Sequence, residues 1–108
     1  MSLFVEIAST LIDLEAELRR LRLWDAQPPS AAALASVEPF CVDTLTLSQW
    51  LQFVFIPRMH ALVNAQQLPP IRCDIHSMAE EYFGRMPLAT DALLVHIARL
   101  DELINTGK

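Results

Sequence analysis

The alternation of apolar and polar positions is clearest in the first twenty residues of the chain. Apolar side chains recur there at steps of three and four residues, at Phe4, Ile7, Leu11, Leu14, Leu18 and Leu21. This spacing places them on one side of an α-helix, and Ser2 can cap the start of that helix. Pro28 and Pro29 prevent it from continuing beyond residues 25–27. We therefore expect an amphipathic first helix that packs into a bundle.

A second apolar stretch, LSQWLQFVFIPRMHALV at residues 47–63, predicts the most buried helix. Thr46 and Gln49 have the spacing of a capping box at its start, and the helical pattern runs to Asn64. On a helical wheel one side collects Leu47, Leu51, Val54, Phe55 and Leu62. Because the stretch is apolar over so much of its surface, we expect it to be the central helix of the bundle.

Pro57 and Arg58 interrupt this apolar stretch. A proline costs about 3 kcal/mol in a helix interior, because it removes a hydrogen bond and crowds the preceding turn. The sequence therefore predicts a kink between Phe53 and Pro57, or a split into two helices with Pro57 at the start of the second.

Arg58 falls on the apolar side of the wheel, so we expect a buried guanidinium with carboxylate or carbonyl partners. The candidate partners are Glu38, Asp43, Glu80 and Glu81. Two interpretations follow: a structural clamp, or an anion-binding arginine in a pocket that the kink opens.

Weaker patterns complete the predicted fold. Ser30 can cap a short helix over residues 31–36, and residues 37–43 predict an irregular connector. Asp74 can cap a helix over residues 75–83 that ends at Gly84. A last helix, at about 88–105, carries Leu93, Ile97, Leu100 and Ile104 at bundle spacing. We therefore expect an all-α, four-helix bundle with a Pro-kinked central helix, forming a single domain over residues 1–108.

Charge and composition narrow the possible partners and location. The chain has 8 basic and 13 acidic residues and a net charge of −5, which argues against direct nucleic-acid binding. Its basic cluster of Arg19, Arg20 and Arg22 is explained by pairing with Glu15 and Glu17 on the first helix. The longest uncharged run, residues 44–57, is shorter than the roughly 20 apolar residues that span a membrane. No signal peptide is evident, so we expect a cytoplasmic protein.

The sequence gives little indication of catalysis or metal binding. Cys73 and His76 have the spacing of one pair of zinc ligands, and Cys41, Asp43, His60 and His96 could supply others. Structural zinc sites usually combine two such close pairs, so we expect no metal and no other cofactor. Nucleophile motifs and glycine-rich phosphate loops are also absent. Enzymatic activity is therefore not indicated.

Four residues are candidates for ligand binding: Asp43, Trp50, Arg58 and His60. A guanidinium matches the geometry of a carboxylate or phosphate, and His60 can titrate near neutral pH. A small-molecule binder of anionic metabolites, with its pocket at the Pro57 kink, is thus one hypothesis for the function.

A family resemblance supplies the other hypothesis. The motifs Pro39-Phe40, Asp43-Thr44, WLQF at 50–53, IPRMHAL at 56–62 and Gln67-Leu68-Pro69 resemble the YqcC-like family of small bacterial proteins. Phe53 departs from the tryptophan expected there. The resemblance covers about residues 39–69 and implies an all-α bundle, with relatives encoded beside a tRNA pseudouridine synthase; it implies no catalytic residues. We therefore expect a non-enzymatic interaction or adaptor protein whose partner is a tRNA-modifying enzyme, another protein or a second copy of itself.

Overall fold

The computed structural model describes residues 2–70 and 72–107, which fold into helices and contain no strand. The α-helices are α1 (Leu3–Arg20), α2 (Ala31–Leu34), α3 (Leu47–Trp50), α4 (Ile56–Asn64), α5 (His76–Gly84) and α6 (Asp91–Thr106). A 3-10 turn, η1 (Pro39–Cys41), and a π-helical turn, η2 (Leu51–Phe55), accompany them. The predicted all-α class is confirmed. None of the described helices is long and apolar enough to cross a membrane.

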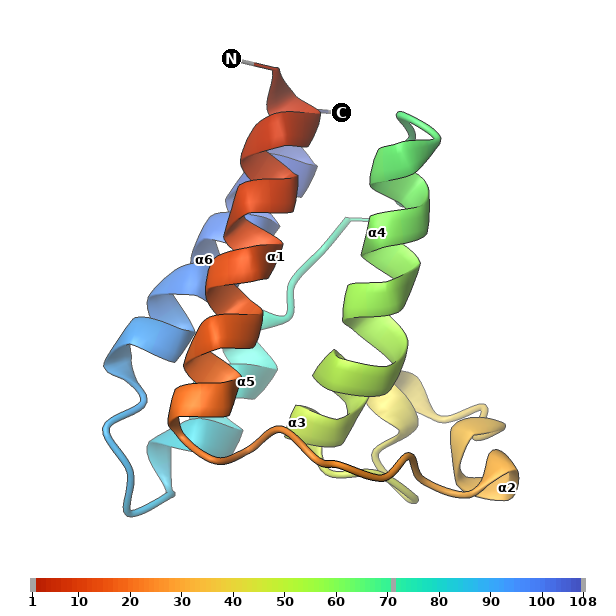
Figure 1. The fold of residues 1–108 in the computed structure, drawn as a ribbon, viewed down its shortest axis with the longest axis vertical. Coiled ribbons are helices and arrows are strands. Elements are labelled where there is room, and N and C mark those ends of the chain that lie inside the picture. Colours follow the sequence, from red (N-terminus) through yellow and green to blue (C-terminus); the bar gives the residue numbers. More distant parts are fainter. Residues whose placement is uncertain (1, 71, 108) are drawn as a thin grey trace.

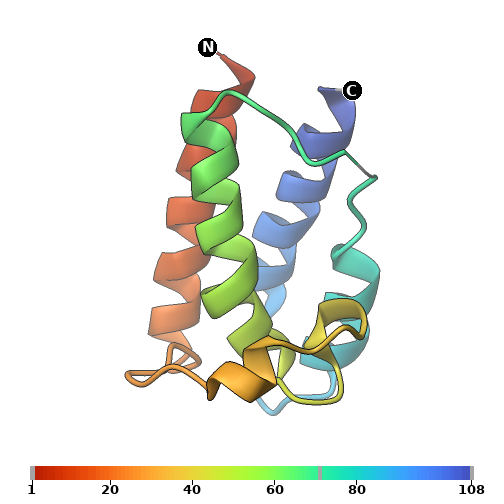
Figure 2. The same ribbon diagram turned by 90° about the vertical axis from the view of Figure 1, so that its right-hand side faces the viewer.

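Four helical segments form the bundle (Figure 1). Helices α1 and α6 run antiparallel and side by side, so that the start of α1 and the end of α6 lie at the same end of the bundle. Segments α3, η2 and α4 follow one another without interruption and form what we call the central rod (residues 47–64). Figure 2 shows the segment that leaves the far end of the rod and descends to the short helix α5, which packs on α6.

The α1–α6 pair has the regular packing that the sequence predicts. Ile7, Leu11, Leu14 and Leu18 are fully buried on α1, and α6 buries Leu93, Ile97, Leu100 and Ile104. The hydroxyl of Ser2 caps α1 by accepting a hydrogen bond from the amide of Val5 at 3.2 Å. Each fully buried aliphatic side chain contributes about 1.5–3 kcal/mol, so this seam supplies much of the stability of the bundle.

The start of the central rod also follows the prediction. Thr46 and Gln49 form the capping box, with each side chain bonded to the backbone amide of the other residue at 2.9–3.1 Å. One turn later, the buried Gln52 amide group both accepts from and donates to the backbone of Asp25 at 2.8 Å. This pair of bonds ties the connection between α1 and α2 to the rod.

The central rod continues through Pro57 because of the π turn that precedes it. The amide of Ile56 donates a hydrogen bond to the carbonyl of Leu51, which lies five residues earlier in the chain. In a regular α-helix the acceptor would be the carbonyl four residues earlier. The wider turn adds one residue and makes room for the proline ring. The disturbance expected between Phe53 and Pro57 is therefore present as a π turn, which joins α3 to α4 and leaves Pro57 in the first turn of α4.

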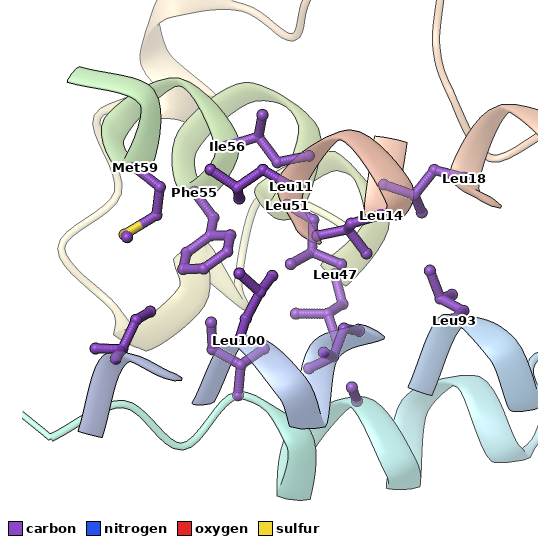
Figure 3. Close-up of a cluster of buried hydrophobic side chains, with 14 of the residues drawn as sticks. Leu11, Leu14, Leu18, Leu47, Leu51, Phe55, Ile56, Met59, Leu93 and Leu100 are labelled. Carbon is purple, nitrogen blue, oxygen red and sulfur yellow. The ribbon is translucent and has the colours of Figure 1, made fainter. Parts of the chain in front are cut away.

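The π turn also changes which residues face the core. Seven residues make almost two turns of a regular α-helix, so Arg58 would lie directly above Leu51. The extra residue in the π turn rotates all later positions about the helix axis by about 100°. Met59 therefore occupies the position above Leu51, and only 1% of its surface is exposed. Figure 3 shows Leu51, Phe55 and Met59 pointing to the side of the rod on which α6 lies.

The expected burial of Arg58 is therefore wrong. Its side chain is exposed, and it forms no hydrogen bond or ion pair within the described residues. The clamp interpretation fails with it, because none of the acidic candidates reaches the guanidinium. Val54 and Leu62, which share its side of the predicted wheel, are only half-buried.

The structure adds detail to the predicted connector and corrects the predicted cap of α5. The predicted connector contains η1, in which Phe40 and Cys41 have positive φ angles of 57° and 50°. Helix α5 begins at His76, and Asp74 does not cap its backbone; the Asp74 carboxylate accepts instead from the hydroxyl of Ser77 at 3.0 Å. The amides at the start of α5 bond to Asp101, a residue of α6.

Candidate binding site

The structure brings together two of the four residues predicted to bind a ligand. Trp50 and Arg58 line one cavity of about 180 Å³ between the central rod, η1 and the segment that precedes α5. Asp43 lies in the connector, where its carboxylate accepts a hydrogen bond from the hydroxyl of Ser36. His60 is exposed on α4 and does not line the cavity.

Aromatic rings form one wall of this space, which we call the aromatic cavity. The rings of Phe40 and Trp50 meet edge to face at a centroid distance of 4.9 Å, and those of Trp50 and Phe55 stack at 5.4 Å. Phe55, Met59 and Ile75 are buried and form the floor. The interior of the cavity is therefore apolar.

The rim of the aromatic cavity is charged. Arg58 comes from the central rod, and Arg72 and Asp74 come from the segment before α5; all three are exposed. Within the described residues neither arginine has a hydrogen bond or ion pair. Two guanidinium groups are thus available at the edge of an apolar cavity, on a chain whose net charge is −5.

Two departures from regular backbone shape the cavity walls. The π turn of η2 directs Phe55 and Met59 inward and leaves Arg58 at the rim. In η1, Phe40 and Cys41 adopt left-handed conformations that cost roughly 1–2 kcal/mol per non-glycine residue. Such conformations persist only where the surrounding contacts enforce them, and they cluster at functional sites.

Helix α6 fixes the remaining wall through two polar side chains. The buried carboxylate of Asp101 accepts from the amides of Ile75 and His76 at 3.1 and 2.8 Å, and from the thiol of Cys73 at 3.0 Å. The side-chain amide of Asn105 accepts from and donates to the backbone of Cys73, at 2.8 and 2.7 Å. These bonds hold residues 73–76 against α6.

Sequence reasoning missed Asp101 and Asn105. The available signal is their spacing of four residues, which places both on one face of α6 beside the buried Ile97 and Ile104. A carboxylate and an amide at that position need polar partners. The sequence, however, does not say that these partners lie 25 or more residues away.

The histidines and cysteines considered as metal ligands are not grouped. Within the part of the chain that the structure describes, no three His, Cys, Asp or Glu side chains lie close enough to hold a metal ion. Cys73 instead donates to Asp101, and Cys41 is buried in the connector.

Comparison with known proteins places this fold in a family. The family model described as DUF446, tRNA pseudouridine synthase C, matches residues 6–103. An uncharacterized protein of Haemophilus influenzae is 37% identical over 98 residues, which are 91% of this chain and 92% of the relative. YqcC of Escherichia coli K12 is 38% identical over 96 residues, covering 83% of each chain.

Two further similarities add a structure and a longer relative. The solution NMR structure of YqcC from E. coli superimposes with a TM-score of 0.78 at 32% identity, covering 97% of this chain and 90% of the other. A tRNA pseudouridine synthase C of Pectobacterium carotovorum is 42% identical over 65 residues, which are 60% of this chain but only 17% of that protein. The chain therefore belongs to the DUF446 family and is a relative of YqcC, as its motifs predict.

Proposed function

We propose that this protein is a non-enzymatic docking domain that binds a tRNA pseudouridine synthase. The observation that carries the proposal is the Pectobacterium protein, which is named tRNA pseudouridine synthase C and contains a region 42% identical to this chain. More than four fifths of that protein lies outside the match. Two modules joined in one polypeptide are held at high effective concentration, and a separate domain achieves the same association by binding its partner.

The charge of the chain favours contact with the enzyme over contact with the tRNA. Affinity for nucleic acid depends on neutralising several phosphates with basic side chains. This chain carries 13 acidic against 8 basic residues, and Arg19, Arg20, Arg85 and Arg99 are engaged by glutamates of the same chain. The docking domain therefore acts on the enzyme, and through it on the modification of tRNA.

The proposal is tested by mixing the purified chain with tRNA pseudouridine synthase C from the same organism. We expect a 1:1 complex by size exclusion and isothermal titration calorimetry, and no retardation of tRNA by the chain alone. A pseudouridine synthase of another family serves as the specificity control. Absence of binding at tens of micromolar, or equal binding to the control synthase, contradicts the proposal.

A second candidate function is the binding of a small anionic metabolite in the aromatic cavity. It is supported by the two rim arginines, which have no partner within the described residues. The volume of about 180 Å³ counts against it, because small-molecule pockets usually measure roughly 300–1,000 Å³. A thermal-shift screen with phosphate, citrate and nucleotides decides: a rise in melting temperature that Arg58→Met abolishes supports this function, and no rise removes it.

A further inference from the structure

We propose that the aromatic cavity is an anchor pocket for one large apolar side chain, carried on an acidic segment of the partner protein. This inference rests on the proposed function and names the surface through which docking occurs. The features that carry it are the size of the cavity, its apolar interior and the two arginines at its rim.

The size of the cavity fits one side chain. A space of about 180 Å³ with a buried floor of Phe55, Met59 and Ile75 holds roughly one leucine or phenylalanine. Protein interfaces concentrate their binding energy in a few such anchors, which lie in well-packed apolar pockets and are surrounded by polar contacts. The dimensions thus match an interface better than a metabolite site.

The charge of the rim indicates which residues of the partner should flank the anchor side chain. Arg58 and Arg72 enter the cavity edge from different segments of the chain, and neither is neutralised by a neighbour among the described residues. Carboxylates on either side of the anchor can form charge-assisted hydrogen bonds with the guanidinium groups. The rim carries two arginines against the single carboxylate of Asp74, whereas the chain as a whole has a net charge of −5, so this rim favours an acidic partner segment.

The backbone around the cavity is preorganised for this role. The left-handed Phe40 places its ring against Trp50, and the π turn keeps Arg58 outside while Met59 forms the floor. Asp101 holds residues 73–76 in place from α6. A pocket whose walls are already fixed loses little conformational entropy on binding. The same connector also exposes Val37 by 95% and Val42 by 55%.

The first test compares two double variants with the same change in net charge. Arg58→Glu with Arg72→Glu reverses the charge of both rim arginines, whereas Arg22→Glu with Arg85→Glu changes two exposed arginines that do not line the cavity, of which Arg85 pairs with Glu81. We expect the rim variant to weaken binding of the synthase about tenfold or more, and the control variant less than about threefold. Circular dichroism checks that both variants keep their helices. Equal weakening by the two variants, or none by either, overturns the inference while leaving the proposed function intact.

The second test does not require the synthase. Nuclear magnetic resonance follows the indole signals of Trp50 and Trp24 while blocked peptides of sequence Asp-Glu-Phe-Glu-Asp and Lys-Lys-Phe-Lys-Lys are added. We expect only the acidic peptide to shift Trp50, and the rim variant to abolish the shift. Trp24, which stacks under Arg19 away from the cavity, is the internal control.

The two tests separate the two proposals. A shift of Trp50 by the acidic peptide without any binding of the synthase supports the pocket and contradicts the proposed function. No shift with either peptide overturns the pocket, and so does a larger shift with inorganic phosphate or tRNA than with the acidic peptide.

Discussion

The α1–α6 pair and the walls of the aromatic cavity are built in different ways. In the pair, apolar residues recur at regular helical spacing, and the backbone keeps standard helical geometry. Around the cavity, the chain uses a π turn, two left-handed residues and a helix start whose amides bond to another helix. Regular packing supplies stability, whereas the irregular segments give the surface a specific shape. Departures from local rules are expected where a protein binds something.

The largest expected effect lies in the regular pair. Leu14→Ala removes a fully buried side chain from the seam between α1 and α6 and should lower the free energy of unfolding by about 2–5 kcal/mol. Ile12→Ala, two residues earlier and 64% exposed, should change it by less than about 0.5 kcal/mol. Urea denaturation followed by circular dichroism measures both. Similar losses in the two variants would contradict the placement of the seam.

A comparably strong test addresses the π turn. Met59→Ala should cost about 2–4 kcal/mol because Met59 is buried, whereas Arg58→Ala should cost less than about 0.5 kcal/mol. A rod without the π turn would expose Met59 and bury Arg58, and would therefore reverse the order. Urea denaturation of both variants, with Trp50 fluorescence as a local probe, distinguishes the two arrangements.

A smaller effect is expected at the contact that joins the two regions. Asp101→Ala leaves the amides of Ile75 and His76 without their acceptor, which should destabilise the fold by about 1–3 kcal/mol. Asp74→Ala, the capping residue that the sequence predicts, should have less than half that effect because its carboxylate bonds only to Ser77. Hydrogen exchange at the amides of residues 75 and 76 checks the mechanism: protection should fall in the Asp101 variant only.

The regularly packed parts of the fold can be predicted from the sequence, and the irregular parts around the cavity cannot. The first helix, its cap at Ser2 and the capping box at Thr46 depend on residues three or four positions apart, so their patterns are visible in the sequence. The all-α class follows from such patterns. A hydrogen bond from residue 56 to residue 51 has no comparable signature. A helical wheel that keeps α-helical spacing through Pro57 therefore places Arg58 on the wrong face.

The candidate site was only partly predictable for the same reason. The chemistry of Trp50 and Arg58 marks them as candidates in the sequence, and both line the aromatic cavity. Arg72 has no such signal, because its role depends on where the segment before α5 lies. That position is fixed by Asp101 and Asn105, which contact residues 25 to 32 positions away. Phe40 adopts a left-handed backbone conformation that is usually found at glycine or asparagine. Its residue type therefore does not predict this conformation.

The smallest effect is the pH dependence of the α1 surface. The Arg20 guanidinium, bonded to both carboxylate oxygens of Glu17 at 2.7–2.8 Å, holds the pKa of Glu17 below its ordinary value of 4.5. A lowered folded-state pKa means that the pair stabilises the fold above pH 4.5, and that this contribution is lost as the pH falls through the folded-state value.

Glu17→Gln should therefore cost less than about 1 kcal/mol at neutral pH, because Arg20 is largely exposed. The difference from the unsubstituted protein should shrink toward zero as the pH falls through the lowered folded-state pKa of Glu17. Urea denaturation between pH 3 and 7 measures this, with Glu15→Gln, which breaks the neighbouring pair with Arg19, as the matched control. Parallel stability profiles for the Glu17 variant and the unsubstituted protein would show that the pair contributes nothing. A cost at neutral pH much larger than 1 kcal/mol would instead show that the ion pair with Arg20 contributes more than its exposure indicates, because glutamine keeps the stem of the glutamate side chain and removes only its charge.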